Sequence, residues 1–299
     1  MLIRIFLPAY NPYGIVQFHF NADGVPLATP GFQGRQIRKT GDFNVAVSIN
    51  RYGFRDIKDL AKSTNDDLFV VGDSFSFGFG VEESERYSDF LQHLLGASVY
   101  NISIPTDFNG YDTLLDYAKQ NGAKIRRLVI GVCMENDLGY YQTLELASER
   151  QTIKAWVSGH LAIYRALASI VHQNAMLNRI GQRIGLITPY DAPATNVSYS
   201  EEVISRSVNR LINLAKDYDS TILIIPSRGL WTGNSQENIA KTHEKFVALL
   251  KKAGQRVVDM APILESGGEP LSYYYPRDGH WKKEAHTLAA EYLVNKLAR

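Results

Sequence analysis

The chain has 299 residues, of which 45% are hydrophobic and 21% charged, and its formal net charge is +1 at pH 7. This composition is typical of a globular protein, and the near-neutral charge gives no sign of a nucleic-acid partner or a strongly acidic substrate. The single cysteine, Cys133, cannot form an internal disulfide, and no Cys and His spacing typical of a metal site occurs. The length fits one large α/β domain with additions, or two domains.

The start of the chain is a short apolar run that Arg4 and Pro8 interrupt, which is too short for a secretory signal. No apolar run in the sequence reaches membrane-spanning length. We therefore expect a soluble, cytoplasmic protein by default. An export signal upstream of the given sequence would change this expectation.

Residues 1–60 have a different pattern of apolar and turn residues from the rest of the chain. Short apolar or alternating pieces at 15–20 and 43–49 are separated by turn residues. This pattern predicts hairpins, so we expect a β-rich N-terminal extension packed on a main domain at 61–299. The basic cluster of Arg35, Arg38 and Lys39 is interpreted as a solvated face, with a binding patch as the alternative. Arg55 is either an ordinary surface residue or reaches the functional site from the extension.

From residue 68 onward, predicted strands and helices alternate. The strands are expected at 68–73, 98–102, 127–132, 221–225 and 256–260. Helical periodicity fits 85–96, 110–121, 201–217, 236–253 and 283–298. Such alternation implies right-handed crossovers and a parallel sheet covered on both faces. The fold prediction is an α/β, three-layer flavodoxin-like sandwich with a central five-stranded parallel sheet in the order 2-1-3-4-5.

The alternation is interrupted between about 139 and 200 by a long stretch with helical periodicity. An insertion between the third and fourth strands emerges at the edge of the sheet where ligands bind in such folds. We interpret it as a helical cap over the site. An extra packing layer or an oligomer interface is the alternative, and the oligomeric state is left open.

Ser74 follows the first strand of the predicted sheet after the turn residues Gly72 and Asp73. A serine at the carboxyl end of a buried strand is aimed by a rigid element into the usual ligand site. It is either a nucleophile or a cap of the following helix or turn. Asp73 is interpreted as bracing this loop through backbone hydrogen bonds.

Other polar residues are expected at the same edge of the sheet. They lie at 101–110, after the second strand, at 131–138, after the third, and at 275–281, before the last helix. A serine hydroxyl needs a neighbouring base to become a nucleophile, and histidine suits that work near neutral pH. A carboxylate must then hold the imidazole in the correct tautomer. His280 and Asp278 are two positions apart, so on an extended turn they can face the same way.

These residues resemble the sequence blocks of the SGNH (GDSL-like) hydrolase family. The blocks are Gly72-Asp73-Ser74-Phe75, Glu135-Asn136-Asp137 and Asp278-Gly279-His280, in the order of the family. The resemblance implies a Ser74 nucleophile, a His280 base and an orienting acid, for which we assign Asp278. The family more often has its acid three positions before the histidine, where this chain has Arg277. If Asp278 points elsewhere, a Ser–His pair steadied by a backbone carbonyl is the alternative.

The resemblance also implies an oxyanion hole, whose donors stabilise the negative charge of the tetrahedral intermediate. Its expected members are the backbone N–H of Ser74, the side-chain amide of Asn136 and a glycine N–H after the second strand. At the expected position of this glycine the chain has Thr106, and Gly110 comes four residues later. Either Gly110 supplies the N–H from a longer loop, or Thr106 does so.

The function expected from the residues and the resemblance is a serine esterase. It hydrolyses a short-chain O-acyl ester, most simply an acetyl ester on a carbohydrate or another small molecule, through an acyl-enzyme on Ser74. No metal or organic cofactor is required. Two alternatives stay open: an O-acyltransferase that moves an acyl group onto a glycan, and a non-catalytic carbohydrate-binding protein on the same fold.

Overall fold

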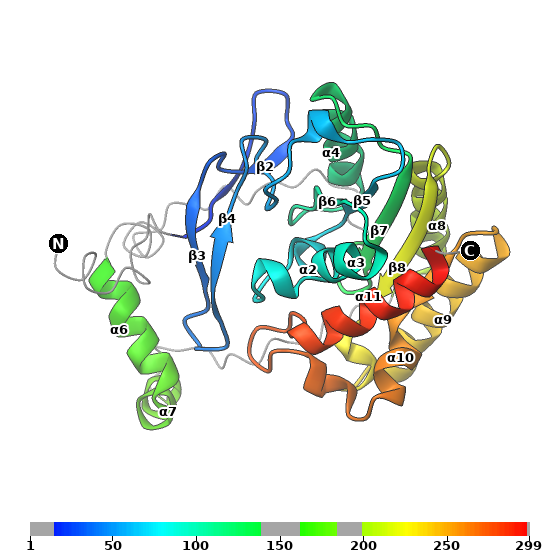
Figure 1. The fold of residues 1–299 in the computed structure, drawn as a ribbon. Coiled ribbons are helices and arrows are strands. Elements are labelled where there is room, and N and C mark those ends of the chain that lie inside the picture. The colour runs from blue at the N-terminus through cyan, green and yellow to red at the C-terminus, as the bar shows by residue number, and fades with distance from the viewer. Residues whose placement is uncertain (1–14, 139–161, 184–198, 298–299) are drawn as a thin grey trace.

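A parallel sheet of five strands forms the centre of the structure (Figure 1). The computed structural model describes residues 15–138, 162–183 and 199–297. The strands of the sheet are β5 (Leu68–Val71), β6 (Val99–Asn101), β7 (Arg127–Cys133), β8 (Asp219–Ile225) and β9 (Val257–Asp259). Their order is β6-β5-β7-β8-β9, which confirms the predicted order 2-1-3-4-5. Because the order reverses beside β5, the loops after the first three strands meet at one edge of the sheet.

Helices cover both faces of this sheet, which confirms the three-layer prediction. On one face lie α3 (Tyr87–Leu95), α10 (Met260–Ser266) and α11 (Lys283–Leu297). On the other face lie α4 (Phe108–Gln120), α8 (Glu201–Ala215) and α9 (Gln236–Lys252). Strand β5 alternates between the two apolar clusters: Leu68 and Val70 belong to the first, Phe69 and Val71 to the second. All four side chains are fully buried, as expected for a central parallel strand.

Differences from the predicted elements lie at their ends and in short pieces. Helix α4 begins at Phe108 rather than 110, because the Asp107 carboxylate caps it by accepting from the N–H groups of Asn109 and Gly110. Helix α10 was not predicted, since it follows β9 directly and is too short to show periodicity. The short 3₁₀ helices in the described part are η3 (Leu60–Lys62), η4 (Glu83–Glu85), η5 (Arg228–Leu230) and η6 (Pro270–Tyr273).

The N-terminal part of the chain is β-rich, as predicted. Strand β1 (Phe18–Phe20) pairs with β2 (Pro26–Ala28), and β3 (Gln33–Ile37) pairs with β4 (Asn44–Ser48), both antiparallel. Figure 1 shows these hairpins beside the sheet domain. Several of their buried residues, among them Val25, Leu27 and Val47, belong to the same apolar cluster as Phe69 and Val71 of β5. The hairpins are therefore a part of the main core, and the boundary at residue 60 stays a prediction.

The insertion after β7 is helical where the structure describes it. It contains α6 (Ala162–Gln173) and α7 (Ala175–Arg183). These helices lie beside the β3–β4 hairpin, with the side chain of Gln173 against Gly41 (Figure 1). The predicted cap over the site depends on residues 139–161 and 184–198 as well, which lie outside the described residues. The cap therefore stays a prediction.

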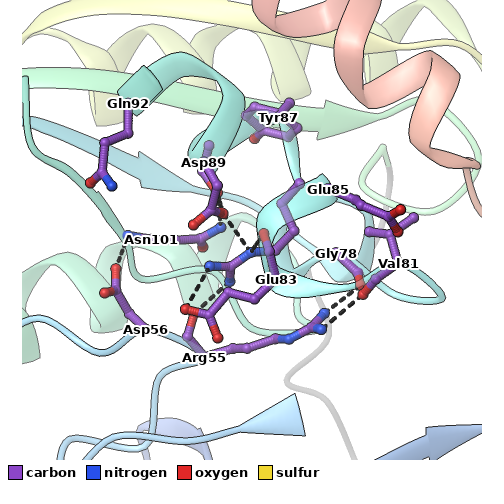
Figure 2. A network of polar contacts seen from close by, with 12 residues as sticks. Arg55, Asp56, Gly78, Val81, Glu83, Glu85, Tyr87, Asp89, Gln92 and Asn101 are labelled. Carbon is purple, nitrogen blue, oxygen red and sulfur yellow. Dashed lines mark hydrogen bonds and ion pairs between the residues drawn. The ribbon is translucent and has the colours of Figure 1, made fainter. Parts of the chain in front are cut away.

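A buried arginine ties the extension to the segment that follows Ser74 (Figure 2). The Arg55 guanidinium donates to the carbonyl oxygens of Gly78 (2.6 Å), Val81 (2.8 Å) and Ala46 (2.8 Å), and the residue is 1% exposed. Burial, helped by the charge of nearby Arg86, lowers the pKa of Arg55 to about 9, so its side chain stays charged at neutral pH. Arg55 is thus neither on the surface nor in the site.

Replacement of Arg55 should destabilise the protein strongly. We expect Arg55→Met to lower the free energy of unfolding by about 3 kcal/mol, because three carbonyl groups, two of them buried, lose their donor. Urea denaturation followed by circular dichroism measures this change. The control is Arg51→Met, whose ion pair with Asp59 lies on the surface and should not move the midpoint. Equal midpoints for the two variants would contradict the assigned role of Arg55.

Candidate active site

Ser74 lies at the carboxyl end of β5, as predicted, and is the first residue of the short helix α2 (Ser74–Phe77). The Asp73 side chain caps this helix by accepting from the N–H of Phe75 at 2.9 Å, which confirms its predicted bracing role. The helix ends at Gly78, whose φ of +85° is unfavourable for other residues. The position of Ser74 is therefore fixed by a strand on one side and a capped turn on the other.

His280 and Asp278 lie together beside Ser74. The distance from His280 Nε2 to Ser74 Oγ is 2.8 Å, and His280 Nδ1 forms a hydrogen bond with Asp278 Oδ1. The turn at Gly279, with a φ of +91°, allows two side chains only two positions apart to face each other. A carboxylate that accepts from Nδ1–H leaves Nε2 free to take the serine proton. Asp278 therefore points toward His280, and the alternative of a Ser–His pair steadied by a backbone carbonyl does not apply.

The Asp278 carboxyl group is buried, with 1% of its side chain exposed. Burial alone raises the pKa of a carboxyl group, but the hydrogen bonds and charge of His280, together with the charge of Arg38, hold the pKa of Asp278 below its usual value. Asp278 is therefore a carboxylate over the neutral range. A buried carboxylate behind an imidazole stabilises the positive charge that the imidazole gains when it takes a proton.

Two phenylalanines from the Ser74 segment hold the imidazole in place. The Phe79 ring stacks on the His280 ring at 4.8 Å between centroids, and the Phe75 ring lies tilted at 4.9 Å. These contacts restrict rotation of the imidazole between its serine and aspartate partners. Sequence reasoning missed both residues, because nothing in a loop sequence distinguishes a phenylalanine that packs on a histidine from one that fills the core.

A pocket of about 250 Å³ opens beside Ser74. Its walls come from the loops after β5, β6 and β7, so the predicted convergence of these loops is observed. The lining residues are Asp73, Ser74, Pro105, Thr106, Asp107, Asn136 and Asp137. The Asn136 side chain lies close enough to the Asp73 carboxyl group to favour its ionised form.

Gly110 does not lie where the sequence prediction requires. Its N–H donates to Asp107 Oδ1 at 3.2 Å in the first turn of α4, and Gly110 does not line the pocket. The space beside its Cα is filled by the Thr106 side chain, whose Oγ1 lies 1.9 Å from where a Cβ would stand. Thr106 itself lines the pocket, and within the described residues its N–H donates to no acceptor. Of the two alternatives, Thr106 is the residue at the pocket, because α4 begins two positions earlier than predicted.

The buried carboxyl groups of Asp73 and Asp137 line the pocket beside Ser74. Burial raises the pKa of Asp73 to about 6, although the positive charge of His280 acts in the other direction. Burial and the charge of Asp73 raise the pKa of Asp137 well above its usual value. Asp137 Oδ2 also accepts from the Tyr111 hydroxyl (3.0 Å) and the Cys133 N–H (2.8 Å). Burial and the Asp73 charge thus favour a proton on Asp137, while the two donors act in the other direction and fix the loop that carries Asn136.

A half-buried ion pair joins the loop that carries Asn136 to η5, the segment after β8. Arg228 donates to Glu135 Oε1 from its backbone N–H (2.8 Å) and Nε (3.0 Å), and to Oε2 from Nη2 (3.0 Å). Its guanidinium also lies against Gly279, where a Cβ would stand 2.4 Å from Cζ. The two partners are 93 positions apart, so no local pattern in the sequence could have paired them.

Two further searches concern only residues 15–138, 162–183 and 199–297. Within them no group of three or more His, Cys, Asp or Glu side chains is placed to hold a metal ion. None of the helices in these ranges is both long enough and apolar enough to pass through a bilayer.

Comparison with known proteins found similarity in structure only: no protein-family model and no curated protein matches the chain. A member of the lipolytic protein G-D-S-L family from Veillonella parvula has 10% sequence identity and a TM-score of 0.44, over 78% of this chain and 98% of that one. A catalytic mutant of an acetylxylan esterase from Geobacillus stearothermophilus has 10% identity and a TM-score of 0.44, over 80% and 97%. The lipase/acylhydrolase from Enterococcus faecalis has 9% identity and a TM-score of 0.46, over 77% and 94%.

Proposed function

We propose that this protein is a serine esterase that hydrolyses a short-chain O-acyl ester, such as an acetyl ester of a carbohydrate. The observation that carries the proposal is the row of contacts from Ser74 Oγ to His280 Nε2 at 2.8 Å, and from His280 Nδ1 to the buried carboxylate of Asp278. Nucleophile, base and orienting acid in this geometry are what acyl transfer through a covalent intermediate requires.

The reaction proceeds in two balanced steps. Ser74 Oγ attacks the ester carbonyl carbon while its proton passes to His280 Nε2, and the C–O bond to the alcohol breaks as His280 returns the proton to the departing oxygen. The acyl group is then bound to Ser74. In the second step water attacks the acyl carbon and gives a proton to His280 Nε2. The bond between the acyl carbon and Ser74 Oγ then breaks, His280 returns the proton to Oγ, and the free acid leaves. Asp278 keeps its negative charge throughout.

Three donors beside the pocket are assigned to the oxyanion. They are the backbone N–H of Ser74, the backbone N–H of Thr106 and the side-chain amide of Asn136. Ser74 is the first residue of its helix, so its N–H has no partner within the helix. Asn136 is exposed and lines the pocket close to the Asp73 carboxyl group. Donors fixed in advance stabilise developing charge without the cost of reorganisation.

The size of the pocket supports a short acyl group. Its volume of about 250 Å³ lies just below the range of roughly 300–1,000 Å³ that is usual for sites of drug-sized ligands. The carboxyl groups of Asp73 and Asp107 in its lining disfavour a negatively charged acyl group. The assignment of a carbohydrate as the alcohol rests on the family resemblance of the three sequence blocks.

The first test is the loss of activity in Ser74→Ala. We expect turnover of p-nitrophenyl acetate to fall by roughly four orders of magnitude, because the nucleophile is removed. The control is Ser76→Ala, in the same helix, whose hydroxyl bonds to Tyr87 and not to His280. Intact mass after treatment with a serine-reactive phosphonate should show one adduct on the wild type and on S76A, and none on S74A.

The alternatives give different results in the same experiments. No adduct on the wild type, or an undiminished adduct on S74A, would overturn the proposal in favour of a non-catalytic carbohydrate-binding protein. Transfer of a labelled acyl group to an added saccharide, in preference to water, would identify an O-acyltransferase that uses the same acyl-enzyme.

The second test concerns the oxyanion donor. We expect Asn136→Ala to lower kcat by roughly 100-fold to 1,000-fold with little change in KM, because its amide is needed only when negative charge develops. The control is Asn121→Ala, at the C-terminal end of α4, which loses a hydrogen bond to Tyr117 O away from the pocket. If N136A and N121A turn over the ester equally fast, Asn136 is not an oxyanion donor.

The third test concerns acyl length. We expect kcat/KM for p-nitrophenyl decanoate to be at least roughly tenfold lower than for the acetate, because the pocket is too small for the longer chain. The S74A variant supplies the background rate for each ester. A decanoate rate equal to or above the acetate rate would show that the pocket does not limit the acyl group.

A further inference from the structure

We propose that Arg38, from the N-terminal extension, is a positioning residue for the reaction and acts through an ion pair with Asp278. The proposal deepens the proposed function and rests on the assigned roles of Ser74, His280 and Asp278. It revises the interpretation of the Arg35, Arg38 and Lys39 cluster as a solvated face. One member of that cluster reaches the carboxylate behind the histidine, 240 positions away along the chain.

The two oxygens of Asp278 have different partners. Oδ1 accepts from Nδ1 and from the backbone N–H of His280, while Oδ2 lies 2.8 Å from Arg38 Nε. Only 1% of the Asp278 side chain is exposed, against 30% for Arg38. An ion pair between two exposed groups contributes little, but here the carboxylate has been removed from water and the guanidinium is its second cationic neighbour. The pair therefore fixes the rotation of the carboxylate that faces His280.

The hairpin that carries Arg38 is itself held against both loops of the site. Arg277 Nη1 donates to the carbonyl oxygen of Thr40 at 3.1 Å, and the Phe43 and Tyr275 rings lie 5.3 Å apart. On the Ser74 side, the Gly80 N–H donates to Gln36 Oε1 at 2.7 Å. Arg38 thus comes from a docked element, and its place beside Asp278 does not depend on the pair alone.

His280 becomes positively charged when it takes the serine proton. The positive charge of Arg38 opposes the formation of this charge. The charged and titratable groups around the imidazole are Asp278 in its own turn, Arg38 in the hairpin, Asp73 before α2 and His286 on α11. Asp278 and Asp73 favour the imidazolium, and Arg38 disfavours it.

The test compares four variants of the full chain. Arg38→Met removes the charge, Arg38→Gln removes it but keeps a polar side chain, and Arg38→Lys keeps the charge. Arg35→Met is the matched control, because Arg35 bonds to Asn44 within the same hairpin. The measurements are kcat and KM for p-nitrophenyl acetate against pH, and the imidazole titration of His280 by NMR, assigned among the seven histidines with His280→Gln.

We expect R38M and R38Q to lower kcat about threefold to tenfold with little change in KM, because the imidazole is held less well. In both, the acid limb of kcat/KM and the NMR midpoint should move to higher pH by about half a pH unit, since a nearby positive charge is lost. R38K should keep the wild-type midpoint, and R35M should change neither quantity.

The proposal is overturned if the midpoint in R38Q equals that in R35M. R38Q decides this alone if R38M does not fold, which circular dichroism checks for every variant. The NMR titration needs no turnover, so it reports on the ion pair even if the esterase assignment fails. An inactive wild type with shifted midpoints would overturn the proposed function and leave the electrostatic coupling in place.

Discussion

The hydrogen bond between Ser74 and His280 is the interaction on which the rest of the site depends, and it joins residues 206 positions apart. Neither residue can make it alone. β5 and the capped turn of α2 fix the hydroxyl, while the Gly279 turn and two phenylalanine rings fix the imidazole. A single hydrogen bond contributes little to the free energy of folding. Many other contacts are therefore needed to place the hydroxyl and the imidazole. The geometry follows from the sheet, whose strand order brings three loops to one edge.

Much of the fold could be predicted from the sequence because its signals are local. Apolar runs such as 127–132 can only be buried strands when turn residues bound them, and alternation with helices then dictates a parallel sheet. The positions of Ser74, Asp278 and His280 were predictable because each lies at the end of such an element and in a block that resembles a known family. Element ends were less predictable: the Asp107 cap moved the start of α4 and with it the position of Gly110.

What could not be predicted depends on contacts between distant segments. The buried Arg55 looks in the sequence like any surface arginine, because its partners are carbonyl oxygens that every residue has. The pair of Glu135 and Arg228, and the contact of Arg38 with Asp278, carry no signal in spacing. Charged residues are normally exposed, so a single sequence gives no reason to bury one. These residues support the loops of the site rather than the sheet, and a fold prediction does not need them.

The docking of the first hairpins on the last loop has a consequence for how the molecule is made. Thr40 leaves the ribosome 237 residues before Arg277, its partner in the finished protein. During synthesis the turn that carries Thr40 and Phe43 must wait for almost the whole chain before it meets Arg277 and Tyr275. Contacts of such long range slow folding and leave hydrophobic surface exposed in the meantime. The site can therefore be completed only after the C-terminal loop has been made, when it docks on a hairpin that was made first.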